Sequence, residues 1–146
     1  HINIWRKMDH MAIYIMIAGT YSALCYPFLS GLTFWIIIGV QWSLVIIGVF
    51  LKIYFFDIPR KINIAIYLCQ GWMIIFVFPK LWRQMELSAF LLLFTGGIVY
   101  TIGTVIYKKK KPNPWPLKLG AHGLFHIFVI IAAICHYIMI WIIYSK

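Results

Sequence analysis

The sequence predicts an all-α, polytopic transmembrane helix bundle, and three features of the chain support this fold class. Hydrophobic residues make up 64% of the 146 residues, while charged residues make up only 11%. A soluble domain usually has about 25% charged residues and no more than about half apolar ones. The apolar residues also form five long runs with short polar segments between them. A water-soluble fold of this size could not bury so much apolar surface in one core.

Each run has the length of a membrane span, because a helix needs about 20 residues to cross the hydrocarbon core. The expected spans cover residues 9–28, 32–51, 62–78, 87–107 and 117–144, and their breaks coincide with Pro, Gly or charged clusters. Helices are required, since an open strand cannot satisfy its backbone in lipid. The prolines at 59, 79, 112, 114 and 116 are expected at or outside helix ends. We expect a single transmembrane domain over residues 1–146, with further sequence upstream because the chain starts without Met.

The basic residues predict the orientation of the chain in the membrane. Cytoplasmic loops are enriched in Lys and Arg. Ten of the 13 basic residues fall on the side of the N-terminus, against three (Lys80, Arg83 and Lys146) on the other side. The ten are Arg6, Lys7, Lys52, Arg60, Lys61, Lys108, Lys109, Lys110, Lys111 and Lys118. We therefore expect a multi-pass protein of the cell membrane with the N-terminal side cytoplasmic and the C-terminus extracytoplasmic. Because these clusters flank apolar spans, they favour contact with membrane lipids over binding of nucleic acid.

Two histidines in the fifth run form the best candidate metal site. His122 and His126 are four residues apart, so they share one face of a helix, within roughly 6 Å of each other. Two imidazoles in this arrangement can bind one Zn²⁺ ion. The alternative is a hydrogen-bonded pair near the start of a helix. His136 lies about 15 Å further along the helix, so it cannot share the ion and is expected to be a hydrogen-bonded core or cavity residue.

An acidic residue at the start of the first run can lie at the same depth in the membrane. Asp9 and the histidine pair are both expected near the cytoplasmic face, so Asp9 could ligate the metal or hold a metal-bound water. The alternative is that Asp9 caps the first helix. His10 should point about 100° away from Asp9 around the helix.

Several segments together resemble the hemolysin III family, the bacterial branch of the superfamily that includes the adiponectin and progestin receptors. The similar stretches are Met8-Asp-His-Met-Ala-Ile-Tyr14, Ala18-Gly-Thr-Tyr21, Gly71-Trp72, Gly96-Gly-Ile-Val-Tyr-Thr-Ile-Gly103 with Tyr107, His122-Gly-Leu-Phe-His126 and Cys135-His136. This resemblance implies a seven-helix bundle, in which the five spans are helices three to seven. It also implies a zinc ion held by His122, His126 and a third histidine upstream of the chain, with Asp9 beside the bound water. Gly123 departs from the family, which usually has Glu there.

Three functions are consistent with these residues. The first is a zinc-dependent intramembrane hydrolase of lipid amides, in which Asp9 is the general base or orients the metal-bound water. The second is a pore-forming cytolysin, as the family name implies, although the sequence shows no row of polar residues on successive helices. The third is a membrane sensor in which zinc has only a structural role. The metal ligands would be the same in the first and third cases.

Overall fold

A computed structural model describes residues 2–55, 58–111 and 118–146, and the regular elements within these ranges are all helices. The predicted all-α fold class is confirmed. In chain order the elements are α1 (Ile2–Phe28), α2 (Gly31–Tyr54), α3 (Arg60–Trp72), the 3₁₀ helix η1 (Met73–Val77), α4 (Phe78–Gln84), α5 (Leu87–Lys109) and α6 (Gly120–Tyr144).

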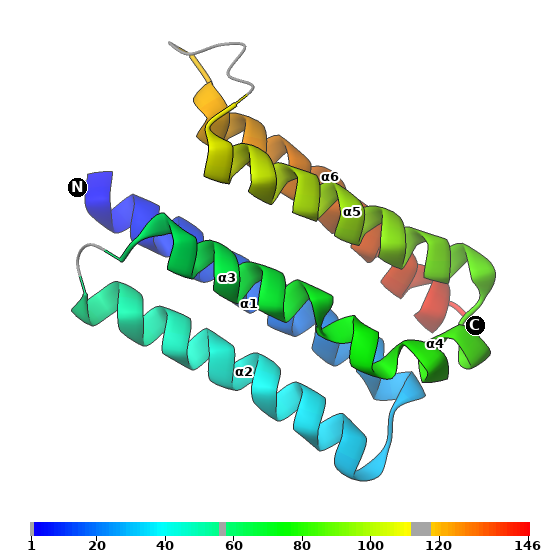
Figure 1. The fold of residues 1–146 in the computed structure, drawn as a ribbon. Helices are drawn as coiled ribbons and strands as arrows, with labels where there is room; N and C mark the ends of the chain where they lie inside the picture. The colour runs from blue at the N-terminus through cyan, green and yellow to red at the C-terminus, as the bar shows by residue number, and fades with distance from the viewer. Residues whose placement is uncertain (1, 56–57, 112–117) are drawn as a thin grey trace. The chain divides into compact units, whose positions relative to one another are not determined.

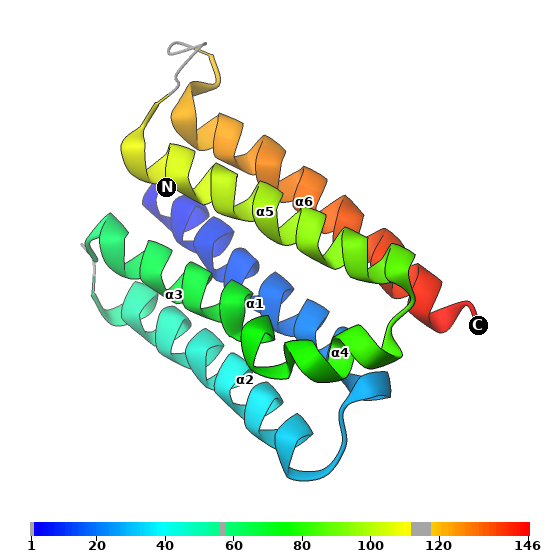
Figure 2. The ribbon, with the colours of Figure 1, turned by 45° about the vertical axis from the view of Figure 1, so that its right-hand side comes forward.

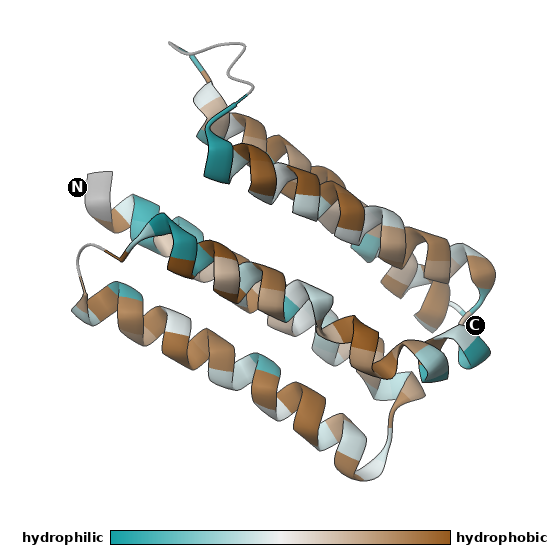
Figure 3. Cartoon of the chain, viewed as in Figure 1, coloured by the Kyte–Doolittle hydropathy of each residue, from teal (hydrophilic) through white to brown (hydrophobic). Residues whose placement is uncertain are grey.

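Five of the helical stretches are long and apolar enough to cross a membrane. They cover Ile4–Phe28, Gly31–Tyr54, Arg60–Gln84, Leu87–Lys109 and Gly120–Tyr144, and the mean hydropathy of their most apolar windows is 1.4 to 2.5. In Figure 3 the hydrophobic colour runs along the helices, and hydrophilic colour gathers toward several helix ends. Large apolar side chains such as Ile46, Phe76 and Ile130 are exposed on the helices. Lipid is the solvent that suits such a surface, so the protein is a multi-pass membrane protein.

The helices pack as two compact units, which cover residues 1–80 and 81–146. In the first unit, α1, α2 and α3 all pack against one another. In the second, α5 and α6 pack along each other. Figures 1 and 2 show both groups from two directions. The expectation of a single domain stays a prediction.

Glycine residues, which have no side chain, allow helices to pack closely in both units. A Cβ atom at Gly48 of α2 would lie 2.6 Å from the ring of Tyr14, which is fully buried in α1. In the second unit, a Cβ at Gly96 would lie 2.5 Å from His136, and one at Gly103 would lie 2.6 Å from Phe128. The two glycines of α5 thus bring its backbone close to α6, the packing role that small residues have in membrane helices.

The third span differs from the uninterrupted helix that the sequence suggested. Pro79 was expected at or outside a helix end, and it lies in the first turn of α4, just after η1 and within the apolar stretch Arg60–Gln84. Proline has no N–H group, so it cannot bond to the carbonyl of residue 75. The N–H of Phe78 bonds to the Ile75 carbonyl instead, which tightens the chain locally into a 3₁₀ turn. The prolines at 112, 114 and 116 and the expected start of the fifth span at Leu117 lie outside the described residues.

Candidate metal centre

His122 and His126 lie in the first two turns of α6, where their rings approach each other closely. The two Nε2 atoms are 3.0 Å apart, and the ring centroids are 4.6 Å apart. His122 is exposed and His126 is half-buried. The expectation that the pair shares one helix face is confirmed, and both nitrogens point to the same region.

The geometry of the pair fits two positions of a zinc coordination shell. Zn–N bonds of about 2.0–2.1 Å in a tetrahedral arrangement place two nitrogens roughly 3.3 Å apart. The Nε2 atoms are 3.0 Å apart, so small side-chain rotations would bring them to this separation. Imidazole nitrogen belongs to the class of ligands that zinc prefers.

Aromatic residues support the pair from within the second unit. Tyr107 of α5 lies with its ring centroid 5.6 Å from that of His122 and stacks on Phe125 at 5.0 Å. Tyr107 and Phe125 are both buried. They form an apolar wall beside His122, and this wall restricts the orientations that the imidazole can take. The family resemblance included Tyr107, but the sequence did not predict its contact with His122.

Asp9 lies within α1, half-buried and about two turns after the start of that helix at Ile2. The alternative that Asp9 caps the helix is therefore wrong, because a capping residue precedes the first turn. The favourable effect of the helix dipole also fades within that turn. Asp9 belongs to the first unit and the histidine pair to the second. Their convergence stays a prediction.

Of the remaining histidines, His10 and His136 each bond to a backbone carbonyl. His10 is buried, and its Nδ1 donates to the Arg6 carbonyl at 2.7 Å. His136 of α6 donates from Nε2 to the Leu93 carbonyl of α5 at 3.3 Å. It lies about 15 Å along the helix from His126. His136 is half-buried, and this bond supports the hydrogen-bonded role that was expected of it. His1 lies outside the described residues.

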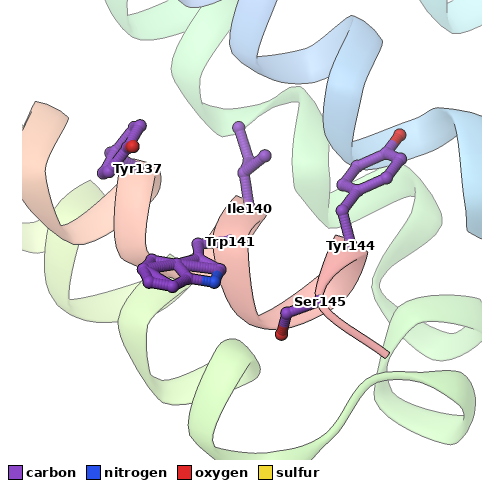
Figure 4. A pocket seen from close by; sticks show the side chains of 5 residues that line it. All are labelled: Tyr137, Ile140, Trp141, Tyr144 and Ser145. Carbon is purple, nitrogen blue, oxygen red and sulfur yellow. The ribbon is translucent and has the colours of Figure 1, made fainter.

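A shallow pocket near the C-terminal end of α6 is separate from the histidine pair. Figure 4 shows its lining side chains, which all come from that end of the helix: Tyr137, Ile140, Trp141, Tyr144 and Ser145. His126 is eleven residues before Tyr137, which is about 16 Å along the helix. Tyr and Trp at the end of a span are typical of the membrane interface.

A family model described as "Haemolysin-III related" matches residues 1–137. The chain belongs to the haemolysin-III-related family. It is 35% identical over 128 residues to the "Hemolysin-3 homolog" of Bacillus subtilis (88% of this chain, 57% of the relative) and 32% identical over 123 residues to the "Hemolysin-3" of Bacillus cereus (84% and 53%). An ADIPOR-like receptor of Saccharomyces cerevisiae is 39% identical over 64 residues, which cover 40% of this chain and 19% of the receptor. No solved structure matches.

The family assignment confirms the resemblance seen in the sequence, including its link to the adiponectin-receptor superfamily. The matched range contains Asp9, His122 and His126. The chain spans about half the length of the curated hemolysin III relatives that it matches. The activity of the whole protein is therefore a matter for proposal.

Sequence reasoning missed a group of buried amides in the first unit. Gln41, Asn63 and Gln70 are all nearly inaccessible to solvent, although they lie in apolar spans. They come from α2 and α3 and bond to α1 and to each other. An isolated amide within an apolar run is the signal that could have identified them, because such groups need partners in the membrane.

Proposed function

We propose that this hemolysin III family protein binds zinc at His122 and His126, with Asp9 beside the metal, and hydrolyses a lipid amide near the cytoplasmic face. The observation that carries the proposal is the 3.0 Å separation of the two Nε2 atoms on α6. Position along the chain supports the role of Asp9: it lies near the start of α1, and the histidines lie near the start of α6. Both helices begin on the side of the membrane that the basic residues assign to the cytoplasm.

Each residue has a distinct role in this proposal. A bound zinc ion would lower the pKa of water and polarise a carbonyl group. His122 and His126 supply two ligands, while Tyr107 and Phe125 restrict the orientation of the His122 ring. Asp9 acts as the general base, a role that contributes about 10²- to 10⁴-fold to a rate. Apolar side chains exposed on α6, such as Ile127 and Ile130, give a lipid chain a compatible surface.

Metal content tests the histidine ligands. The whole protein, with any sequence beyond residues 1–146, is purified in detergent, and its bound metals are measured by mass spectrometry. We expect about one zinc ion per chain. His122→Ala combined with His126→Ala should abolish this binding. His136→Ala is the matched control, since it removes an imidazole from the same helix, and it should keep the zinc. Zinc retained by the double variant would rule out this site.

Turnover of a lipid amide tests the role of Asp9. Asp9→Asn preserves size and hydrogen bonding but removes the base. We expect the variant to keep its zinc while hydrolysis falls by about 10²-fold or more. Unchanged hydrolysis would show that Asp9 is not the base. If the wild-type protein binds zinc without hydrolysing lipid amides, the structural role of zinc in a membrane sensor is favoured. Leakage of vesicles carrying the wild-type protein would instead favour the pore-forming cytolysin suggested by the names of the Bacillus relatives.

A further inference from the structure

At the break in the third span, side chains from two other helices form hydrogen bonds with backbone groups of that span. In an uninterrupted α-helix the Ile74 N–H would bond to the Gln70 carbonyl. Because α3 ends at Trp72, these two groups find other partners. The hydroxyl of Tyr21 in α1 accepts from the Ile74 N–H at 3.0 Å and donates to the Gly71 carbonyl. Gln41 of α2 donates from Nε2 to the Gln70 carbonyl at 2.8 Å. Tyr21 of α1 thus replaces the acceptor of this bond, and Gln41 of α2 replaces its donor.

The side chains at this break belong to a buried polar network that joins the three helices of the first unit. Gln70 donates from Nε2 to Gln41 Oε1 at 3.3 Å and to the Tyr14 carbonyl at 3.4 Å. The hydroxyl of Tyr14 donates to Asn63 Oδ1 at 2.9 Å. Gln41 and Gln70 are both fully buried. The break is therefore a polar site within a span that is otherwise apolar.

One acceptor in this network lacks a protein partner. Among the residues that the structure describes, Gln70 Oε1 makes no hydrogen bond. Exchanging the amide oxygen and nitrogen of Gln70 would not help, because its Nε2 faces two acceptors. The orientation of Gln41 is set in the same way, since its Nε2 faces the Gln70 carbonyl. The contacts of both amides thus leave Gln70 Oε1 as the group in need of a donor.

We propose that the break in the third span binds an ordered water molecule, which donates a hydrogen bond to Gln70 Oε1. An unpaired buried acceptor is costly, especially where the surroundings are hydrocarbon. Ordered water commonly completes the hydrogen bonds of interrupted membrane helices. The groups bonded to Gln70 are the side-chain amide of Gln41 and the backbone carbonyl of Tyr14, and neither carries a negative charge that would offset a cation, so a neutral donor suits the site. The site is independent of the proposed metal centre.

Radiolytic footprinting tests for this water. Brief X-ray exposure splits bound water, and the hydroxyl radicals oxidise adjacent side chains, methionine among the most readily. The whole protein is irradiated in lipid nanodiscs, and oxidation is measured by mass spectrometry. Met73 is the reporter, because its Sδ lies 3.4 Å from Gln41 Nε2 and it is 7% exposed. Met139 of α6 is the matched control, because it is fully buried in the second unit. We expect Met73 to oxidise several-fold faster than Met139, and equal rates would overturn the proposal.

Gln70→Leu tests whether Gln70 holds the water. The substitution replaces the amide by an apolar side chain of similar size. In a variant that keeps the wild-type elution volume and helix content, Met73 oxidation should fall to the rate of Met139. A rate of Met73 oxidation that stays at the wild-type value would place the water elsewhere and contradict the assignment. If the variant does not fold, the comparison of Met73 with Met139 in the wild-type protein decides the question.

Discussion

At the scale of single residues, Tyr21 has an unusual role because its hydroxyl replaces backbone bonds of another helix. It accepts from the Ile74 N–H and donates to the Gly71 carbonyl, and its side chain is buried. Tyr21→Phe keeps the ring but leaves both backbone groups without this partner. We expect the free energy of unfolding to fall by about 1–3 kcal/mol, measured by denaturant titration in detergent.

Tyr26 provides the matched control for that substitution, because it lies in the same helix and is 71% exposed. Tyr26→Phe should change the free energy of unfolding by less than about 0.5 kcal/mol. Equal effects of the two substitutions would show that the Tyr21 hydroxyl does not stabilise the break.

Glu86 forms an ion pair whose effect on its protonation can be measured. Its carboxylate accepts from the Lys146 ammonium and from the Ser88 hydroxyl, and these contacts lower the pKa of Glu86. A lowered pKa in the folded state stabilises the protein above the pKa of an unfolded glutamate, about 4.3. This contribution is lost as the pH falls through the lowered value. We expect Lys146→Met to raise the pKa of Glu86 toward that of an ordinary glutamate, as followed by carbon NMR of the labelled side chain. No change would show that the pair does not persist in solution.

At the scale of the helices, adjacent glycines of α5 should respond oppositely to the same substitution. A methyl group at Gly96 would lie 2.5 Å from His136 Nε2, whereas nothing lies within 4 Å of one at Gly97. Gly96→Ala should therefore lower the free energy of unfolding by about 1–3 kcal/mol through overpacking. Gly97→Ala should be neutral or stabilising, since alanine favours a helix over glycine by up to about 1 kcal/mol.

Thermal unfolding of the two alanine variants in detergent checks this difference. Adding His136→Ala to Gly96→Ala removes the imidazole with which the methyl group would collide. If the collision is the cause, the cost of Gly96→Ala should shrink in the His136→Ala background. Destabilisation of similar size at Gly96 and Gly97 would instead point to a general loss of backbone flexibility.

At the scale of the whole molecule, the distribution of basic residues predicts which helix ends face the cytoplasm. Single cysteines at Lys110, after α5, and at Gln84, at the end of α4, report on opposite ends of the spans. A membrane-impermeant maleimide applied to intact cells should label Gln84→Cys but not Lys110→Cys. Lysed cells should show labelling at both positions, and the parent chain corrects for its own cysteines. Labelling of Lys110→Cys in intact cells would reverse the orientation.

The sequence by itself determined the fold class, the number of spans and the pairing of His122 with His126. These depend on local properties, because a run of apolar residues specifies a helix in lipid and a spacing of four specifies a shared face. The helix boundaries were less well determined. The helix α1 begins at Ile2, about two turns before the expected start at residue 9, so Asp9 is not a capping residue.

Only the tertiary structure decided how polar groups in the spans find partners. The local sequence pattern could suggest that Pro79 lies at a helix end, but not that Tyr21 and Gln41 complete the hydrogen bonds of the third span across the first unit. It likewise identified Tyr107 as a motif residue without its contact to His122. These contacts join residues that are 15 to 53 positions apart. Hydropathy and spacing describe neighbours along one helix, whereas such contacts depend on which faces of different helices meet.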